Sequence, residues 1–472
     1  MLSDPKSRFK PTSTAVADKS NILSALKQPY SNAARIAGTM RNAYLTNGSV
    51  SKVIDYYQSH PTYNYNIYPV LGNKQYELND NVRNSYIDIA YYLRDLNIKF
   101  FAPIFFKETL IDGVTFWYKY QDKDGVGYMK LPMEWCLIRG TENGVYRYMF
   151  DITKLNDETV QSMPEEFQNA YKEYQSNNTS DTNTWYNNKY YYVQENGMAF
   201  TFDYNSLVNG GLAISPFASA LTDIISLAKA KDNVNIKDNL DATRILQQKL
   251  PMDKKDGEML ISAKEAMIYD QTIRGRLPEG VILATTPTEL ENIPLTNSGT
   301  ANAFDTVNKG LEQVFFSMGG SSPLFGGSTT SSNIVKEGIK KDANWIYANL
   351  FPMLENYYNS EIATVKTKDK LLWNIKFIRQ SNFTLHDDIM NLKDQLTLGG
   401  SRTDYLAANG FIPAEIISKL TFEQQALDID SLMVVKPTSN TLSAKDAEIQ
   451  KRGRPKTDNP SDDTDRLDDE QG

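Results

Sequence analysis

The chain has 472 residues, of which 40% are apolar and 11% are aromatic, a composition that is typical of a globular protein and excludes wholesale disorder. Its formal net charge of −8 argues against a protein that grips nucleic acid over its whole surface. The single cysteine, Cys136, excludes an internal disulfide framework and fits a reducing cytoplasm.

The N-terminal 20 residues are polar and contain Pro5 and Pro11, which predicts a mobile arm. This arm lacks an apolar signal region, and no segment of the chain approaches eighteen apolar residues, so we expect neither secretion nor membrane spanning. Residues 31–59 and 80–96 carry apolar residues at helical spacing.

From residue 100 to residue 204 the apolar period changes towards two, which is typical of strands. Residues 114–132 predict a hairpin with Asp124-Gly125 at its turn and with Phe116, Tyr118 and Tyr120 on one face. We expect further strands in 144–152 and 189–203, a helix over 158–174, a polar loop at 176–184, and a buried strand that makes Cys136 a structural thiol. Together these elements predict an α+β domain over residues 21–214.

Residues 215–250 contain no proline or glycine after Pro216 and predict one long helix. In residues 259–295, Ser262 and Glu265 form a capping box for a helix that reaches about Arg276. A turn at 277–280 and a short strand at 280–287 follow.

Residues 298–362 predict a helix, a loop and a second helix. The first helix carries an apolar stripe at three- and four-residue steps: Phe304, Val307, Leu311, Val314, Phe315 and Met318. The sequence GGSSPLFGGSTTSS at 319–332 is rich in glycine and hydroxyl residues, which argues against both helix and packed strand. A helix resumes at Asn333 and passes Pro352, where a kink is expected. The simplest interpretation is two helices joined by a flexible surface loop.

The C-terminal part contains a predicted strand at 371–383 that should rejoin the first domain. Three helical stretches follow over 384–433, broken at residues 399–400 and 410–413. From residue 434 the chain is polar, with a basic cluster before an acidic end, as in solvated tails.

This order of segments resembles the portal proteins of tailed bacteriophages. The helix, the loop with its PLFGG patch and the second helix are similar to the stem, tunnel loop and kinked helix of those proteins. The run KEAM…LPEGV…TTP…ENI within 259–295 is similar to the clip of portals from phages of Gram-positive hosts, and the Pro-Thr-Ser run, GRPK and acidic end resemble their C-termini. The resemblance is specific over residues 215–472 and diffuse over 1–210.

The resemblance implies an α+β, portal-like subunit with defined parts. These are an N-terminal arm (1–20), an α+β wing (21–214), a stem helix (215–250), an α/β clip (251–297), a second stem helix (298–318), a tunnel loop (319–332), a kinked helix with a returning strand (333–383), a helical crown (384–433) and a disordered tail (434–472). Twelve subunits would form a ring at one vertex of the capsid, through which double-stranded DNA is packaged and ejected. A net acidic chain suits such a passive conduit, because a strongly basic wall would hold phosphates.

The resemblance also implies partners and site residues. The expected partners are the terminase large subunit, a head-completion adaptor, and capsid and scaffolding proteins, in a virion assembled in the host bacterial cytoplasm, with no membrane. The clip contact would use Arg274, Arg276, Glu279, Glu289 and Glu291. Stem packing would use Phe304, Leu311 and Phe315. The channel residues would be Gly319, Gly320, Ser321, Gly326, Gly327, Ser328, Thr329, Thr330, Ser331, Ser332, Lys336 and Lys340, although the two lysines could equally serve only to solubilise an exposed helix.

The sequence offers no catalytic set, so we expect no enzyme, no metal and no cofactor. The only histidines are His60 and His386. His386 stands beside Asp387 and Asp388, but Thr384 as N-cap and the helix dipole account for those carboxylates. The 319–332 loop lacks the Gly-Lys-Ser/Thr ending of a P-loop, as a conduit served by a separate ATP-driven terminase would.

Two other interpretations remain open. The chain could be a head–tail adaptor or a tail structural protein without a DNA channel. It could also be an enzyme with a cleft in the tyrosine-rich domain, which would require a convergent set of titratable residues that the sequence does not announce.

Overall fold

The computed structural model describes residues 19–71, 79–123, 125–207, 210–242, 244–253, 256, 258–277, 281–286, 300–320, 322–325, 332–369 and 371–428. The fold class is α+β, as the sequence predicts, with helices and mostly antiparallel strands in separate stretches of the chain. The chain divides into two compact units, residues 1–414 and 415–472.

The N-terminal part is helical. Its helices are α1 (Lys19–Lys27), α2 (Ala33–Thr46), α3 (Gly48–Ser59), α4 (Asp80–Asp95) and α5 (Ile98–Asp112). Helices α2, α3 and α4 fall where the sequence predicts them. Helix α5 corrects the prediction of strand-like structure from residue 100. Because α5 is buried on several sides, its apolar residues do not form the single stripe by which an amphipathic helix is recognised.

A seven-stranded antiparallel sheet follows, in the order β3-β2-β8-β5-β7-β6 with β4 paired to β5. The strands are β2 (Val114–Asp122), β3 (Gly125–Leu131), β4 (Cys136–Glu142), β5 (Val145–Asp151), β6 (Trp185–Tyr186), β7 (Tyr190–Tyr192) and β8 (Gly197–Thr201). The predicted hairpin is confirmed by the register of β2 on β3. Phe116 and Tyr118 are buried, whereas Tyr120 reaches the exposed end of the hairpin.

Helix α6 (Glu165–Gln175) is shorter than the predicted helix over 158–174. A 3-10 turn (Val160–Ser162) occupies the earlier residues, and Pro164 stands immediately before the α-helix. Proline lacks an amide hydrogen and fits only the start of a helix, so the helix begins after it.

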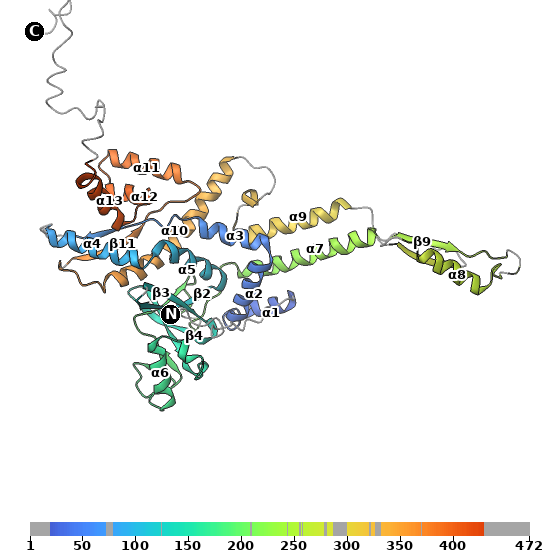
Figure 1. Cartoon of the computed structure of the whole chain (residues 1–472), viewed down its shortest axis with the longest axis horizontal. Coiled ribbons are helices and arrows are strands. Elements are labelled where there is room, and N and C mark those ends of the chain that lie inside the picture. The colour runs from blue at the N-terminus through green and yellow to red at the C-terminus, as the bar shows by residue number, and fades with distance from the viewer. Residues whose placement is uncertain are drawn as a thin grey trace, which may run out of the picture. The chain divides into compact units, whose positions relative to one another are not determined.

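Helices α7 (Leu221–Ala242) and α9 (Thr300–Ser317) lie side by side (Figure 1). Ser317, at the end of α9, donates a hydrogen bond to Asp223, near the start of α7, and Gly310 lies against Leu227, so the two helices are antiparallel. Between them in the chain come β9 (Arg244–Lys249), α8 (Ala263–Arg274) and β10 (Val281–Thr286). The single helix predicted over 215–250 is therefore wrong at its C-terminal end, because residues 244–249 pair with β10 as a parallel strand.

Helix α10 (Ser332–Ile362) continues through Pro352, as the sequence predicts. Strand β11 (Leu372–Phe377) pairs antiparallel with β1 (Tyr65–Val70), a strand that the sequence analysis missed. The strand therefore returns to the 21–214 segment, but to a two-stranded sheet of its own and not to the large sheet. The three predicted C-terminal helices are α11 (Leu385–Thr397), α12 (Arg402–Ala408) and α13 (Pro413–Gln425).

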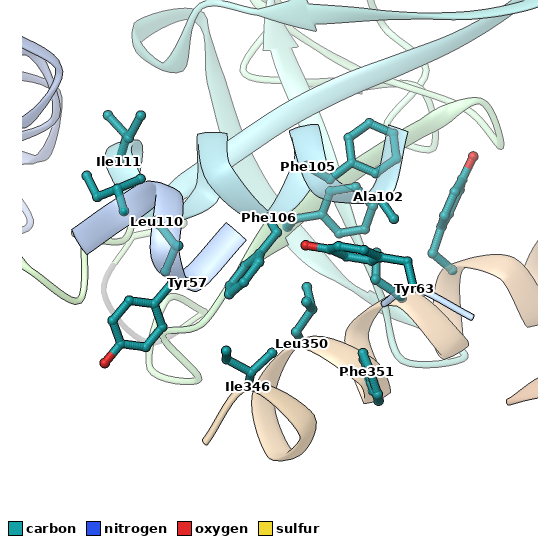
Figure 2. Close-up of a cluster of buried hydrophobic side chains, with 14 of the residues drawn as sticks. Tyr57, Tyr63, Ala102, Phe105, Phe106, Leu110, Ile111, Ile346, Leu350 and Phe351 are labelled. Atoms are coloured by element: carbon teal, nitrogen blue, oxygen red, sulfur yellow. The ribbon is translucent and has the colours of Figure 1, made fainter. Parts of the chain in front are cut away.

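The largest hydrophobic core joins helices that are far apart in the sequence. Figure 2 shows Phe106 of α5 pointing toward Ile346 and Leu350 of α10, with Tyr57 of α3 nearby. These side chains are nearly or fully buried. The C-terminal two thirds of α10 are thus a core element of the first unit, packed on α5 and α3.

A cluster of four charged side chains ties α2 and α5 to β3. Arg41 donates to Glu108 (2.7 Å) and to Asp112 (2.7 Å), and Lys130 bonds the same two carboxylates. Burial raises the pKa of Glu108, but Lys130 and Arg41 outweigh this effect and lower it to about 2. Each cation is shared by two acids, so the cluster holds three elements in one arrangement.

We predict that this cluster makes stability fall in acid. Because the folded pKa of Glu108 (about 2) is below its ordinary value of 4.5, its contribution is full above pH 4.5 and is lost as pH falls towards 2. The contribution should be about 2–3 kcal/mol. Denaturant unfolding followed by circular dichroism should show Glu108→Gln with a flatter decline of stability below pH 4.5 than the parent. Glu134→Gln, at an exposed position, is the control; equal slopes for all three proteins would contradict the prediction.

Candidate functional site

The contact between α9 and α7 is apolar at the C-terminal end of α9. Val314, Phe315 and Met318 are buried, and Leu311 is partly buried against the same core, which also contains Leu227 of α7. The side chain of Phe304 lies outside the described residues. Val307 also packs against this core, so the predicted stripe is a packing face from Val307 onwards, and its role in contacts between subunits stays a prediction.

Phe315 also holds the segment that follows the helix. Its ring stacks on Phe325 with centroids 4.9 Å apart and an interplanar angle of 14°. Phe325 in turn meets the edge of Tyr56 of α3 at 5.5 Å. The sequence analysis treated residues 319–332 as one flexible loop, but Ser322–Phe325 forms a 3-10 turn whose Phe325 packs into an aromatic cluster. The signal that could have found this anchor is the pair Leu324 and Phe325, two large apolar residues in an otherwise small and polar run.

Gly319 provides the sharp exit from α9. Its φ of +73° lies in the left-handed region, which glycine adopts without steric cost, and an added Cβ would lie 3.3 Å from the Tyr57 hydroxyl. Gly320 and Ser332 are also described, whereas the predicted loop residues Ser321, Gly326, Gly327, Ser328, Thr329, Thr330 and Ser331 lie outside the described residues.

The first turns of α10 present the two predicted lysines to solvent. Lys336 and Lys340 are exposed, whereas Val335 and Ile339 are half-buried and Ile346 is fully buried. The Lys340 ammonium donates to Glu337 at 2.9 Å, and this hydrogen bond raises the pKa of Lys340. The face that the sequence assigns to these lysines is confirmed, although Glu337 offsets part of their charge.

Helix α10 is first anchored at Asp342. This buried carboxylate accepts a hydrogen bond from the Tyr56 hydroxyl at 3.1 Å, and burial raises the pKa of both groups. One turn further along α3, His60 is fully buried, with Nδ1 2.9 Å from the Ser381 hydroxyl, and burial lowers its pKa to about 4. His60 is therefore neutral near pH 7, and its buried ring links the end of α3 to the segment that contains Ser381.

A groove of about 960 Å³ runs between α9 and α10. Its walls carry Lys309, Glu312 and Phe316 from α9, and Glu337, Lys341 and Asp342 from α10. Phe316 is 80% exposed. The charges of both signs are interspersed, so this groove offers neither a focused anion site nor a set of groups for acid–base chemistry.

In the β9–α8–β10 unit, which we call the clip, helix α8 and strand β10 form where the sequence predicts them, whereas β9 was expected to be helical. Ser262 and Glu265 form both hydrogen bonds of the capping box that starts α8. Arg274 is not the free rim residue that was expected, because it pairs with Asp270 at 3.2 Å, and Asp270 also accepts from Thr285 of β10 at 2.6 Å. Arg276 is exposed. The other predicted contact residues, Glu279, Glu289 and Glu291, lie outside the described residues.

In the described part of the chain, no cluster of three or more His, Cys, Asp or Glu residues could hold a metal ion. Asp388, which stands near His386, accepts hydrogen bonds from the Thr384 hydroxyl (2.8 Å) and from the Ser381 amide (3.1 Å). Thr384 does occupy the N-cap position, but its side chain makes no capping bond. Cys136 is buried, and burial raises the pKa of its thiol, as expected for a structural residue.

None of the helices in the described residues is long and apolar enough to cross a membrane.

Comparisons with known proteins give similarity to solved structures but no match in sequence. No family model matches the chain, and no curated protein matches it. Among solved structures, the chain is similar to one from the virion of a native gene transfer agent particle, with a TM-score of 0.41 and 11% identity over 80% of this chain and 90% of that chain. The function proposed below therefore rests on the contacts within this chain.

We predict that Phe315→Ala destabilises the subunit whereas the adjacent Phe316→Ala does not. Phe315 is 7% exposed and stacked on Phe325, so its truncation should cost about 3 kcal/mol. Phe316 is 80% exposed, so its truncation should stay within about 0.5 kcal/mol. Thermal and denaturant unfolding of the unassembled subunit measure both variants, and equal losses would contradict the assigned packing face.

Proposed function

We propose that this chain is the portal protein of a tailed phage or prophage. Twelve copies would form a ring at the unique capsid vertex, through which DNA is packaged and later ejected. The observation that carries the proposal is the antiparallel α7–α9 pair, which encloses the β9–α8–β10 unit in the chain and leads through an anchored turn into the 31-residue helix α10. This is the order of stem, clip, stem, tunnel loop and kinked helix that the sequence resemblance implies.

The remaining parts follow from the same assignment. The seven-stranded sheet and helices α2 to α6 correspond to the wing, and the helices after residue 384 correspond to the crown. The stem helices are α7 and α9, with the first ending at Ala242 and not at residue 250. The subunit would act by shape and assembly, without catalysis and without a cofactor.

The segment from Gly319 to Lys340 suits a wall that DNA slides past. Phe325 anchors one part of the 319–332 segment, and the rest is rich in glycine and hydroxyl residues that contact phosphates only weakly. Beside it, Lys336 and Lys340 are exposed, and Glu337 offsets Lys340. A ring of such helices would give the duplex a modest electrostatic contact without locking onto bases.

The clip would carry the contact that is exchanged between the terminase large subunit during packaging and the head-completion adaptor afterwards. Arg276 is the described residue best suited to this role, since Arg274 is held by Asp270. Capsid and scaffolding proteins would contact the ring elsewhere, and the assembled protein would belong to the virion.

The second candidate is a head–tail adaptor or tail protein without a DNA channel. The paired helices favour it as much as they favour a portal, because helical contacts also occur in such proteins. The long helix α10 after the anchored turn, for which an adaptor needs no counterpart, favours the portal.

The first test is the mass and shape of the purified protein. Native mass spectrometry should give a closed oligomer near twelve subunits, or eleven to thirteen when it is assembled in isolation, as is expected from the family that the chain resembles. Electron microscopy should show a ring with a central channel. A protein that stays monomeric or dimeric at all concentrations would contradict the proposal, and a ring without a stem and crown would favour the adaptor.

A second test concerns the channel. Lys336→Glu with Lys340→Glu, and separately deletion of residues 326–330, should leave ring formation intact because neither change touches the apolar stripe of α9, and both lysines are exposed. Both should lower the amount of full-length DNA that is packaged and retained in an in vitro packaging assay. The control is Lys154→Glu with Lys172→Glu on the exposed surface of the sheet domain, which makes the same change of charge. Normal packaging by both variants would remove the assignment of this segment to the channel.

A third test separates the clip contact from the clip fold. Arg276→Glu should leave the ring and the melting temperature unchanged but weaken binding to the terminase or to the adaptor by roughly tenfold, as expected when a favourable charge contact at an interface becomes repulsive. Arg274→Glu should instead loosen the clip itself, because it breaks the pair with Asp270. If Arg276→Glu rings package DNA and bind both partners normally, the terminase and adaptor surface lies elsewhere.

A further inference from the structure

The described side chains of the clip bury little apolar surface. Among the described residues 244–286, the buried apolar side chains are Leu250 and Leu283, and α8 has no buried residue. Six large apolar side chains are exposed in the same unit: Leu246, Met259, Leu260, Met267, Ile268 and Tyr269. A single helix over two strands usually needs more buried surface than this, so another surface has to cover it.

The clip sheet is also open at both edges. Strands β9 and β10 run parallel, and within the described residues each has a strand on one side only. Parallel sheets are normally buried and contain more than two strands, and an exposed strand edge is a template for pairing with another chain. One open edge belongs to β9 and the other to β10, and the two strands run in the same direction.

Leu246 lies on the part of the two-stranded clip sheet that helix α8 does not cover. It is the register partner of Leu283, so both side chains project from the same face. Helix α8 covers that face at β10, where Thr285 bonds Asp270 and Leu283 is 4% exposed. Leu246, at β9, is 48% exposed. The helix therefore shields the β10 half of the face and leaves the β9 half open.

Helix α8 carries exposed apolar residues on both flanks. Met267 and Tyr269 are 67% and 55% exposed, and two residues along a helix correspond to a rotation of about 200°. They therefore point to nearly opposite sides of the helix axis. The face turned away from the sheet, opposite Asp270, carries Ile268 and Thr272, both exposed. A helix placed between two neighbours would have this pattern.

We propose that a second copy of this chain docks on the clip by parallel strand addition, with β10 of one subunit beside β9 of the next. One such contact pairs an open edge of each subunit, brings a neighbouring α8 over Leu246, and covers one flank of each of the two helices. Because the two edges differ, the contact is head-to-tail and repeats from subunit to subunit, which closes a ring when the rotation allows. The inference rests on the proposed ring-forming function and specifies one of its interfaces.

The surface favours a second copy over other occupants. Lys264 is the sole exposed cation without an acidic partner among the described residues of α8, so the helix offers little to phosphates. The exposed residues are apolar on both sides of the contact, and the two strand edges have matching direction. A different protein could cover one edge, whereas a copy of this chain covers both in every subunit.

The experiment compares wild-type rings with three variants at these positions: Leu246→Glu, Met267→Glu and Tyr269→Glu. Each places a carboxylate in the proposed contact, so the fraction of ring at a fixed concentration should fall by roughly tenfold or more, as expected for burial of an unpaired charge. Thr272→Glu makes the same change of charge on the outward face of α8 and should assemble within about twofold of the parent. Circular dichroism and melting of the subunits check that all four variants fold.

Hydrogen exchange adds a measurement that needs no variant. In wild-type rings, peptides that cover 244–249 and 281–286 should exchange much more slowly than in dissociated subunits, because the new ladder protects backbone amides at both edges. Rings that form normally in all variants and show no added protection of these strands would overturn the strand addition while leaving the portal proposal intact. Wild-type protein that forms no ring would remove the portal proposal itself.

Discussion

The aromatic contact of Phe315, Phe325 and Tyr56 is the interaction on which the rest of the arrangement depends. It joins the end of α9, the turn that follows and helix α3, and Tyr56 also bonds Asp342 at the first buried turn of α10. Two long helices that enter the segment at 319 and leave it at 332 are thereby fixed to the same point of the core. Phe325 is therefore the residue of the 319–332 segment on which the attachment of both helices depends.

At the start of α10, as in the chain as a whole, acidic residues offset the positive charge of the lysines. The exposed start of α10 carries Lys336, Lys340 and Lys341, yet Glu337 bonds Lys340 and Asp342 is buried behind them. Fixed positive charge is therefore present but partly offset. If this surface lines the proposed DNA channel, weak and compensated attraction would suit it better than strong attraction, because each phosphate contact would have to be released at every step.

Local signals in the sequence predicted many elements, and contacts between distant segments account for the failures. The capping box at Ser262, the Asp124-Gly125 hairpin and the breaks between the last three helices depend on neighbouring residues, and the elements appear where they were expected. Residues 244–249 have no helix breaker, and only the distant β10 makes them a strand. Helix α5 was missed because burial on several sides hides its period, and β1 because its partner lies some 300 residues away, at β11. The anchor at Phe325 depends on Tyr56 in the same way.

For Arg274 and Leu246, the contacts in the structure indicate roles that differ from those predicted from the sequence. By sequence, Arg274 belongs to a charged rim, but its pair with Asp270 and the bond from Asp270 to Thr285 make it part of the clip frame. Leu246, which the sequence placed inside a long helix, is instead an apolar residue at the open edge of a two-stranded sheet. The charges thus hold the clip together, while its uncovered apolar residues lie at the edges. In the ring that we propose, such a unit would complete its core by association, and its stability and the assembly of the ring would be one equilibrium.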